Sequence, residues 1–90
     1  MMLSGPRGEA AITHGAATLL STLALAPGRR LENWQLMEAM KEDAENFSTA
    51  ALRVRIVRLR QLLRQVGFEG PTVRAMRLEG YQLCIPVTLA

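Results

Sequence analysis

The sequence is poor in the residues from which several kinds of functional site are built. Its 90 residues include one cysteine and one histidine, so an internal disulfide is impossible and a metal site would lack ligands. No apolar run approaches the roughly 20 residues needed to span a membrane. The N-terminus lacks a basic stretch followed by an apolar block, so we expect no export signal. These absences are consistent with a reducing compartment, and we expect the protein in the cytoplasm.

Patterns typical of catalysis and of phosphate binding are also missing. We find no grouping of acid, base and nucleophile, and no glycine-rich loop between a strand and a helix at the required spacing. We therefore expect no enzyme activity, no metal and no cofactor. Cys84 falls in a predicted strand between Leu83 and Ile85, where we expect a small core residue. His14 is expected at a turn or helix start rather than in a site.

Acidic residues are almost absent from one part of the chain. Residues 53–77 contain seven arginines and a single acid, Glu69, for a formal charge of +6. Residues 32–45 carry five acids against Lys41, for a formal charge of −4. The basic segment suits a polyanion, and an ordinary solvated helix face is the alternative. Because every basic residue in it is arginine, whose fork matches phosphates and base edges, contact with nucleic acid is favoured.

Turn residues and apolar spacing divide the chain into predicted elements. Turn chemistry at residues 4–8 indicates a short hairpin within residues 1–12. Apolar residues then recur at helical spacing, and after residue 71 the pattern alternates as in strands. The predicted elements are helices over 15–26, 32–41 and 49–66 and a C-terminal hairpin over 72–87. This order predicts one α+β domain over residues 1–90, a winged helix-turn-helix with a short N-terminal β-hairpin.

Candidate capping residues mark the ends of the predicted helices. Thr13 can cap the first helix, and Ser48 or Thr49 can cap the third. A proline and a glycine at residues 27–28 end the first helix, and Gly67 suits the position just after the third.

The third predicted helix has two different faces. One narrow arc at 100° per residue carries the expected core residues Leu52, Ile56, Leu59, Leu63 and Val66. The opposite face carries Val54, Val57 and Gln61, with arginines around them. Exposure to water does not stabilise two valine side chains at these positions. In a major groove, however, a valine can touch a thymine methyl and an arginine can bond guanine. Arg55 and Arg60 lie nearer the margins of the core arc, from which their long stems can reach phosphates.

Two segments resemble the C-terminal effector domain of OmpR/PhoB-type response regulators. Residues 56–63, IVRLRQLL, are similar to the family pattern I-x-R-L-R-x-x-L. Residues 72–83, TVRAMRLEGYQL, are similar to its wing, T-V-R-G-x-G-Y-R. The resemblance extends over about residues 12–85. It implies a winged helix-turn-helix that binds DNA and regulates transcription as the output domain of a two-component system.

The resemblance also implies roles for individual residues. Arg58 and Val54 match positions that contact bases, Arg77 matches an arginine that reaches the minor groove, and Tyr81 matches a tyrosine that anchors the wing. The loop over residues 41–48 matches a segment linked to RNA polymerase contact, and a homodimer on DNA is a further expectation. Phosphate contacts are expected from Arg55, Arg60 and Arg64. The complete set of expected DNA-binding residues is Val54, Arg55, Val57, Arg58, Arg60, Gln61, Arg64, Arg74 and Arg77.

The chain departs from the family pattern at several places. Arg53 stands where the family usually has an acid, and Leu78 stands where it usually has a glycine that can take a positive φ. The family's four-stranded N-terminal platform has room for only two short strands, and the sequence contains no receiver segment. Arg53 and Leu78 favour the alternative function, a winged helix that binds a protein partner or a second copy. Trp34 is expected as a partly exposed packing residue, with contact to DNA backbone or a partner as the alternative.

Overall fold

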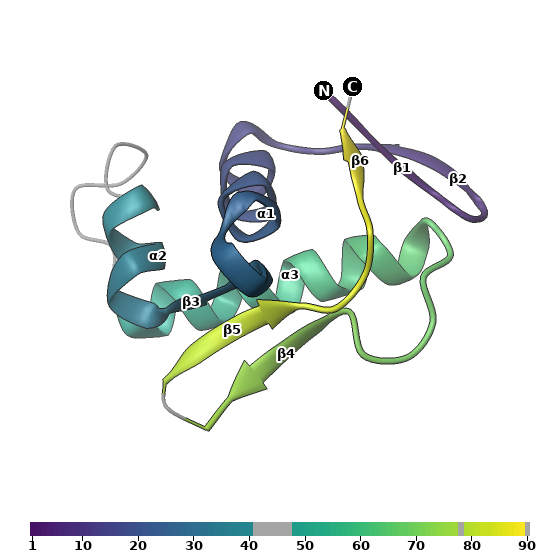
Figure 1. Cartoon of the computed structure of the whole chain (residues 1–90). Coiled ribbons are helices and arrows are strands. Elements are labelled where there is room, and N and C mark those ends of the chain that lie inside the picture. The colour runs from purple at the N-terminus through teal and green to yellow at the C-terminus, as the bar shows by residue number, and fades with distance from the viewer. Residues whose placement is uncertain (41–47, 78, 90) are drawn as a thin grey trace.

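The structure is a computed structural model that describes residues 1–40, 48–77 and 79–89, and it is an α+β winged helix-turn-helix (Figure 1). Its elements are β1 (Met2–Gly5), β2 (Gly8–Ala11), α1 (His14–Leu25), the 3-10 turn η1 (Pro27–Arg29), β3 (Arg30–Glu32), α2 (Asn33–Met40), α3 (Thr49–Gln65), β4 (Val73–Met76), β5 (Gly80–Leu83) and β6 (Thr88–Leu89). The fold class predicted from the sequence is confirmed. None of the helices in the described ranges is long and apolar enough to cross a membrane.

The helices begin where side chains satisfy the first free backbone N–H groups. The Thr13 hydroxyl accepts from the Ala16 N–H at 3.2 Å, so α1 begins one residue earlier than predicted. The Ser48 hydroxyl accepts from the Ala51 N–H at 3.1 Å, which makes Ser48 rather than Thr49 the cap of α3. At the start of α2, the Gln35 side chain accepts from the Glu32 N–H at 2.9 Å. α2 is shorter than the predicted 32–41, and residue 41 lies outside the described residues.

α3 ends in a glycine turn that also holds the N-terminal hairpin. Gly67 has a φ of 102°, and its N–H donates to the Arg64 carbonyl at 3.0 Å. The Phe68 N–H donates to the Leu63 carbonyl at 3.1 Å, which completes the Schellman pattern. The Arg7 N–H donates to the Val66 carbonyl at 2.9 Å. The turn between β1 and β2 is therefore fixed against the end of α3.

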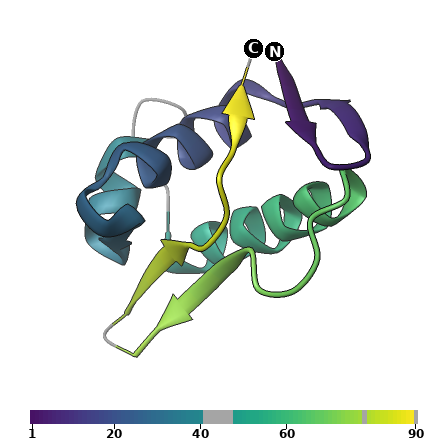
Figure 2. The same cartoon turned by 45° about the vertical axis from the view of Figure 1, so that its right-hand side comes forward.

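The strands form two antiparallel sheets of three strands each, in the orders β2-β1-β6 and β3-β5-β4. Two strands were not expected: β3, which pairs with β5, and β6, which pairs with β1 through Leu3 and residue 89. Both are too short to show an alternating pattern. The second strand of the hairpin predicted over 72–87 ends at Leu83, and the chain then crosses to β1 as β6. The N-terminal sheet therefore has three strands rather than two. The two ends of the chain lie side by side (Figure 2).

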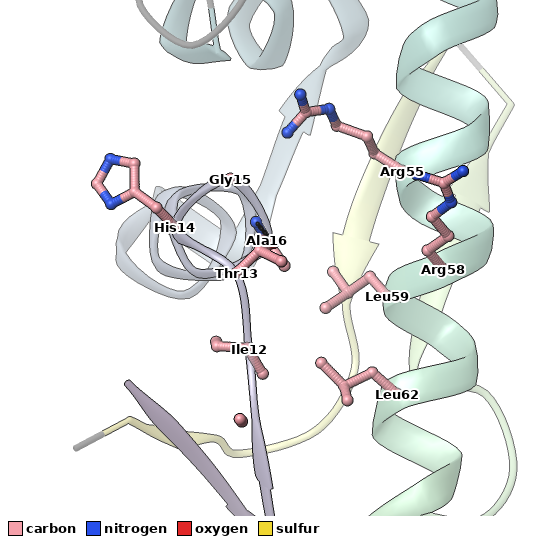
Figure 3. Close-up of a pocket in the computed structure, with 10 residues that line it drawn as sticks. Ile12, Thr13, His14, Gly15, Ala16, Arg55, Arg58, Leu59 and Leu62 are labelled. Carbon is pink, nitrogen blue, oxygen red and sulfur yellow. Dashed lines mark hydrogen bonds between the residues drawn. The ribbon is translucent and has the colours of Figure 1, made fainter.

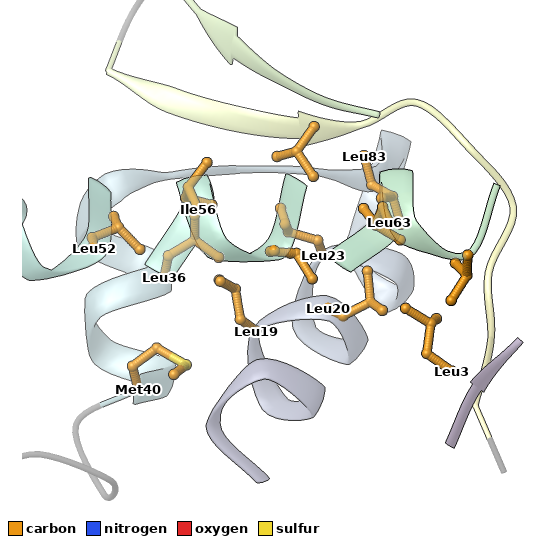
Figure 4. Packing of buried hydrophobic residues seen from close by; sticks show 13 residues of the cluster. Leu3, Leu19, Leu20, Leu23, Leu36, Met40, Leu52, Ile56, Leu63 and Leu83 are labelled. Atoms are coloured by element: carbon orange, nitrogen blue, oxygen red, sulfur yellow. The ribbon is translucent and has the colours of Figure 1, made fainter. Parts of the chain in front are cut away.

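The hydrophobic core lies where α1, α2 and α3 meet the two sheets (Figure 4). α1 contributes Leu19, Leu20 and Leu23, all fully buried. All five residues of the predicted arc of α3 are buried, which confirms that prediction: Leu52, Ile56, Leu59, Leu63 and Val66. β1 adds Leu3, and β5 adds Leu83. The inner face of α3 is therefore fixed in the core, and its other face points outward.

The prediction that Cys84 is a core residue is wrong, because its side chain is exposed. Successive side chains of a strand point to opposite faces, so with Leu83 directed into the core the next residue, Cys84, faces outward. The Cys84 backbone N–H still donates to the Thr72 carbonyl at 2.8 Å, which extends the hairpin by one bond. Trp34 is 64% exposed, and its indole N–H donates to the Glu32 carboxylate.

Candidate nucleic-acid interface

The outward face of α3 presents apolar side chains surrounded by arginines. Val54 and Val57 are each 48% exposed, on the side opposite the buried arc. Arg53, Arg58 and Arg64 are also exposed, and each has a long stem and a permanent charge. The remaining exposed residues of this face are Ala50, Gln61 and Gln65. Exposing two β-branched apolar residues in the middle of a basic face leaves apolar surface in water, which contact with another molecule would remove.

Most of these arginines have no partner within the described ranges. The side chains of five arginines make no hydrogen bond or ion pair with another described residue: Arg53, Arg58, Arg64, Arg74 and Arg77. Glu69, the one acid of the basic segment, pairs with Arg7 at 3.3 Å instead, and both side chains are exposed. Exposed guanidinium groups that lack acceptors among the described residues are available to an anion such as a phosphate.

The wing, β4 and β5 with their turn, is fixed at its tip by β3 and α2. Tyr81 of β5 pairs with Leu31 of β3 in antiparallel register. The Asn33 N–H, at the first residue of α2, donates to the Glu79 carbonyl in the wing turn at 2.8 Å. Glu79 has a φ of 55°, so this residue of the turn adopts the left-handed conformation. Leu78, where the family usually has glycine, lies outside the described residues.

A groove runs between the wing tip, the first turns of α3 and the start of α2. Arg53 and Arg77 both line it, together with Trp34 and Tyr81. Glu32 and Glu79 also border the groove, so it carries charges of both signs. Arg53 departs from the family pattern and is not among the DNA-binding residues expected from the sequence. Only the folded position of the wing brings it into the same groove as Arg77.

A second concavity, of about 620 Å³, separates α3 from the start of α1 (Figure 3). Ile12, Leu59 and Leu62 supply apolar lining, and Arg55 and Arg58 line the side formed by α3. In Figure 3 the Arg55 side chain reaches from α3 toward the start of α1, and a Cβ on Gly15 would meet its guanidinium. The first turn of α1 contains no acidic residue. Because the N-terminus of a helix is itself positive, this region concentrates positive charge.

The structure distributes the expected site residues over four places. Val54, Val57, Arg58, Gln61 and Arg64 share the outward face of α3. Arg74 and Arg77 are exposed on the wing. Arg55 is half-buried and directed toward α1, and Arg60 is half-buried at the base of the wing, where its Nε donates to the Val73 carbonyl at 2.9 Å. The loop expected to contact RNA polymerase lies mostly outside the described residues, since 41–47 are not described.

The chemistry available on this surface is the binding of a polyanion together with apolar contact. A helix about 10–12 Å wide fits the major groove of duplex DNA, and a short hairpin beside it can reach the neighbouring groove.

The family model described as "Transcriptional regulatory protein, C terminal" matches residues 7–83 of this chain. None of the curated proteins and none of the solved structures gives a significant match.

Proposed function

This chain belongs to the family of transcriptional regulatory protein C-terminal domains, which bind DNA to regulate transcription and are not a class of enzymes; we propose that it binds specific duplex sequences with α3 in the major groove. The wing would reach the adjacent minor groove through Arg77. Family membership gives DNA binding as the function, and we propose the particular residues and grooves that take part in it.

The observation that carries the proposal is the exposed pair Val54 and Val57 at the centre of a ring of arginines. A valine side chain can read thymine through its methyl group, which only the major groove presents. The arginines around the pair, including Arg58 and Arg64, can reach guanine edges or phosphates from the same position. Duplex DNA offers both apolar methyl groups and phosphates, which makes it the partner that this face fits best.

We assign base contacts to Val54 and Arg58, with Val57 and Gln61 beside them on the same face. Phosphate contacts are assigned to the basic residues around this centre. These phosphate-binding residues are Arg55, Arg64 and Arg74. Arg53 is added because it has no partner among the described residues and lines the same groove as Arg77. Contacts with bases determine sequence preference, and contacts with phosphates supply affinity that depends on salt.

The test is selection of binding sites from a random duplex library, followed by fluorescence anisotropy on the selected sequence. We expect Arg58→Ala to weaken binding by about 1–3 kcal/mol and to relax preference at one base pair. We expect Arg64→Ala to weaken binding to all sequences alike and to reduce the salt slope by about 0.9. The first change tests direct reading of a base, and the second tests contact with a phosphate.

Arg7→Ala is the matched control, because Arg7 is an exposed arginine paired with Glu69 and lies off the proposed face. It should leave affinity and salt slope close to those of the unaltered protein. A failure to enrich any sequence, or an affinity that does not change with salt, would contradict the proposal. Amide chemical shifts that do not change when duplex DNA is added, together with a dimer in sedimentation, would favour the protein-binding alternative.

Three further parts of the proposal follow from family membership. We propose that the chain binds DNA as a homodimer, that the loop over residues 41–48 contacts RNA polymerase, and that the protein acts in the cytoplasm, where its DNA target would lie. Sedimentation of the protein with its selected duplex gives the stoichiometry. Cross-linking from positions in the loop to polymerase tests the second part.

A further inference from the structure

Arg60 differs from the other arginines of α3 in what it contacts. Its side chain is half-buried, and its Nε donates to the Val73 carbonyl at 2.9 Å. Val73 is the first residue of β4, and its own side chain is 3% exposed. The bond therefore joins the proposed recognition helix directly to the base of the wing. A charged donor in a partly dry environment makes a stronger hydrogen bond than a neutral donor in water.

The register of the wing explains why this carbonyl is open to Arg60. The Cys84 N–H donates to the Thr72 carbonyl at 2.8 Å, so these two residues form a hydrogen-bonded pair. Hydrogen-bonded and non-hydrogen-bonded pairs alternate in an antiparallel ladder. The next pair, Val73 with Leu83, is therefore non-hydrogen-bonded, and the Val73 carbonyl points away from β5. Since β4 pairs only with β5 among the described strands, its outer edge needs a partner from elsewhere.

The wing is thus held at two separated points. At its tip, the Asn33 N–H bonds the Glu79 carbonyl at 2.8 Å and fixes the turn to α2. At its base, Arg60 fixes β4 to α3. With the second contact removed, the hairpin would keep its attachment to β3 and α2 but lose its only described polar link to α3. The angle between the wing and α3 would then no longer be fixed by that bond.

We propose that Arg60 is a positioning residue, which holds the wing at one angle to α3 so that α3 and Arg77 address neighbouring grooves as one rigid unit. The inference rests on the proposed function for its effect on DNA, and it replaces the phosphate contact expected for Arg60 from the sequence. Arg60 acts through Arg77. Its removal should therefore cancel what Arg77 contributes, instead of subtracting one phosphate contact.

The test is a double-mutant cycle on the selected duplex. Arg60→Met removes the donor and the charge but keeps an apolar stem of similar length. We expect Arg77→Ala to weaken binding about tenfold in the unaltered protein and less than about twofold when Arg60→Met is already present, a coupling typical of residues that act together. Arg64→Met is the matched control, because Arg64 is an exposed arginine on the same helix. Its effect should multiply with that of Arg77→Ala.

Independent, multiplicative effects of Arg60→Met and Arg77→Ala, with the salt slope reduced as in Arg64→Met, would overturn the proposal in favour of a phosphate contact. If Arg60→Met does not fold, Arg60→Lys replaces it, because lysine keeps the charge but lacks the guanidinium Nε. A phosphate role then predicts unchanged affinity and unchanged coupling. A positioning role predicts reduced coupling to Arg77.

A measurement on the free protein separates this inference from the proposed function. Residual dipolar couplings of the wing and of α3 should fit one rigid orientation in the unaltered protein and fail to do so in Arg60→Met. A wing that keeps its orientation in the variant would overturn the inference even if DNA binding is established. A wing that loses it supports Arg60 as the positioning residue even if the protein binds no duplex.

Discussion

Replacing Gly80 by alanine should release the wing from the strand that supports it. A Cβ on Gly80 would lie 2.5 Å from the Leu31 carbonyl oxygen and 3.1 Å from the Glu32 Cα, and both are backbone atoms of β3. Backbone cannot rotate aside as a side chain can, so β3 and β5 must separate. Overpacking of this kind costs about 1–3 kcal/mol, and weakening one hydrogen bond between the strands adds about 1 kcal/mol.

The expected loss of about 2–4 kcal/mol is large for a protein of this size. At roughly 0.05–0.15 kcal/mol per residue, 90 residues give a free energy of unfolding of about 5–14 kcal/mol. At about 4–8 °C per kcal/mol, the midpoint of thermal unfolding should fall by about 8–32 °C. Urea unfolding followed by circular dichroism at the helix band measures the free energy, and a thermal scan measures the midpoint.

Gly15→Ala is the matched control for this prediction. Its Cβ would also meet a neighbour, but that neighbour is the end of the flexible Arg55 side chain. The guanidinium can move, and alanine favours the helix by up to about 1 kcal/mol. The stability of Gly15→Ala should therefore stay within about 1 kcal/mol of that of the unaltered protein. Equal losses from both substitutions, or no loss from Gly80→Ala, would refute the reasoning that backbone contact decides the cost.

The remaining predictions concern the core and one helix cap, and all are measured by urea unfolding. Leu20→Ala should cost about 2–5 kcal/mol because Leu20 is fully buried, whereas Leu25→Ala on the same helix should change stability by less than about 0.5 kcal/mol because Leu25 is 87% exposed. Equal effects would contradict this packing of α1. Ser48→Ala should cost about 1 kcal/mol by removing the bond to the Ala51 N–H, and Ser48→Asp should restore most of it. A variant Ser48→Ala as stable as the original would show that this cap contributes nothing.

The helices could be predicted from the sequence because their signals are local. The apolar arc from Leu52 to Val66 needs only the helical period, and the caps at Thr13 and Ser48 need only short-range chemistry. The same helical period predicts that Val54 and Val57 are exposed, since a residue opposite the core arc must face outward. These predictions were correct because none of them depends on how distant segments of the chain pack together.

The features that were missed depend on distant segments. β3 and β6 are strands only because β5 and β1 offer them an edge, and no alternating pattern of two or three residues can show this. Cys84 is the exception, because alternation from the buried Leu83 already directs its side chain outward. The contact between Arg60 and Val73 and the groove shared by Arg53 and Arg77 depend on the angle of the wing, which spacing along the chain does not determine.

The pairing of β1 with β6 has a mechanical consequence. The two strands are antiparallel with Leu3 opposite residue 89, so both chain ends leave from the same end of the ladder. A force that draws the ends apart would open the bonds between β1 and β6 one after another, as a zipper opens, and would not load them together. Closing this ladder joins residues more than 80 positions apart, so its loop entropy is among the largest in the fold. It should therefore be the last part of the structure to form and the first to open under load, with the three helices and the wing still folded.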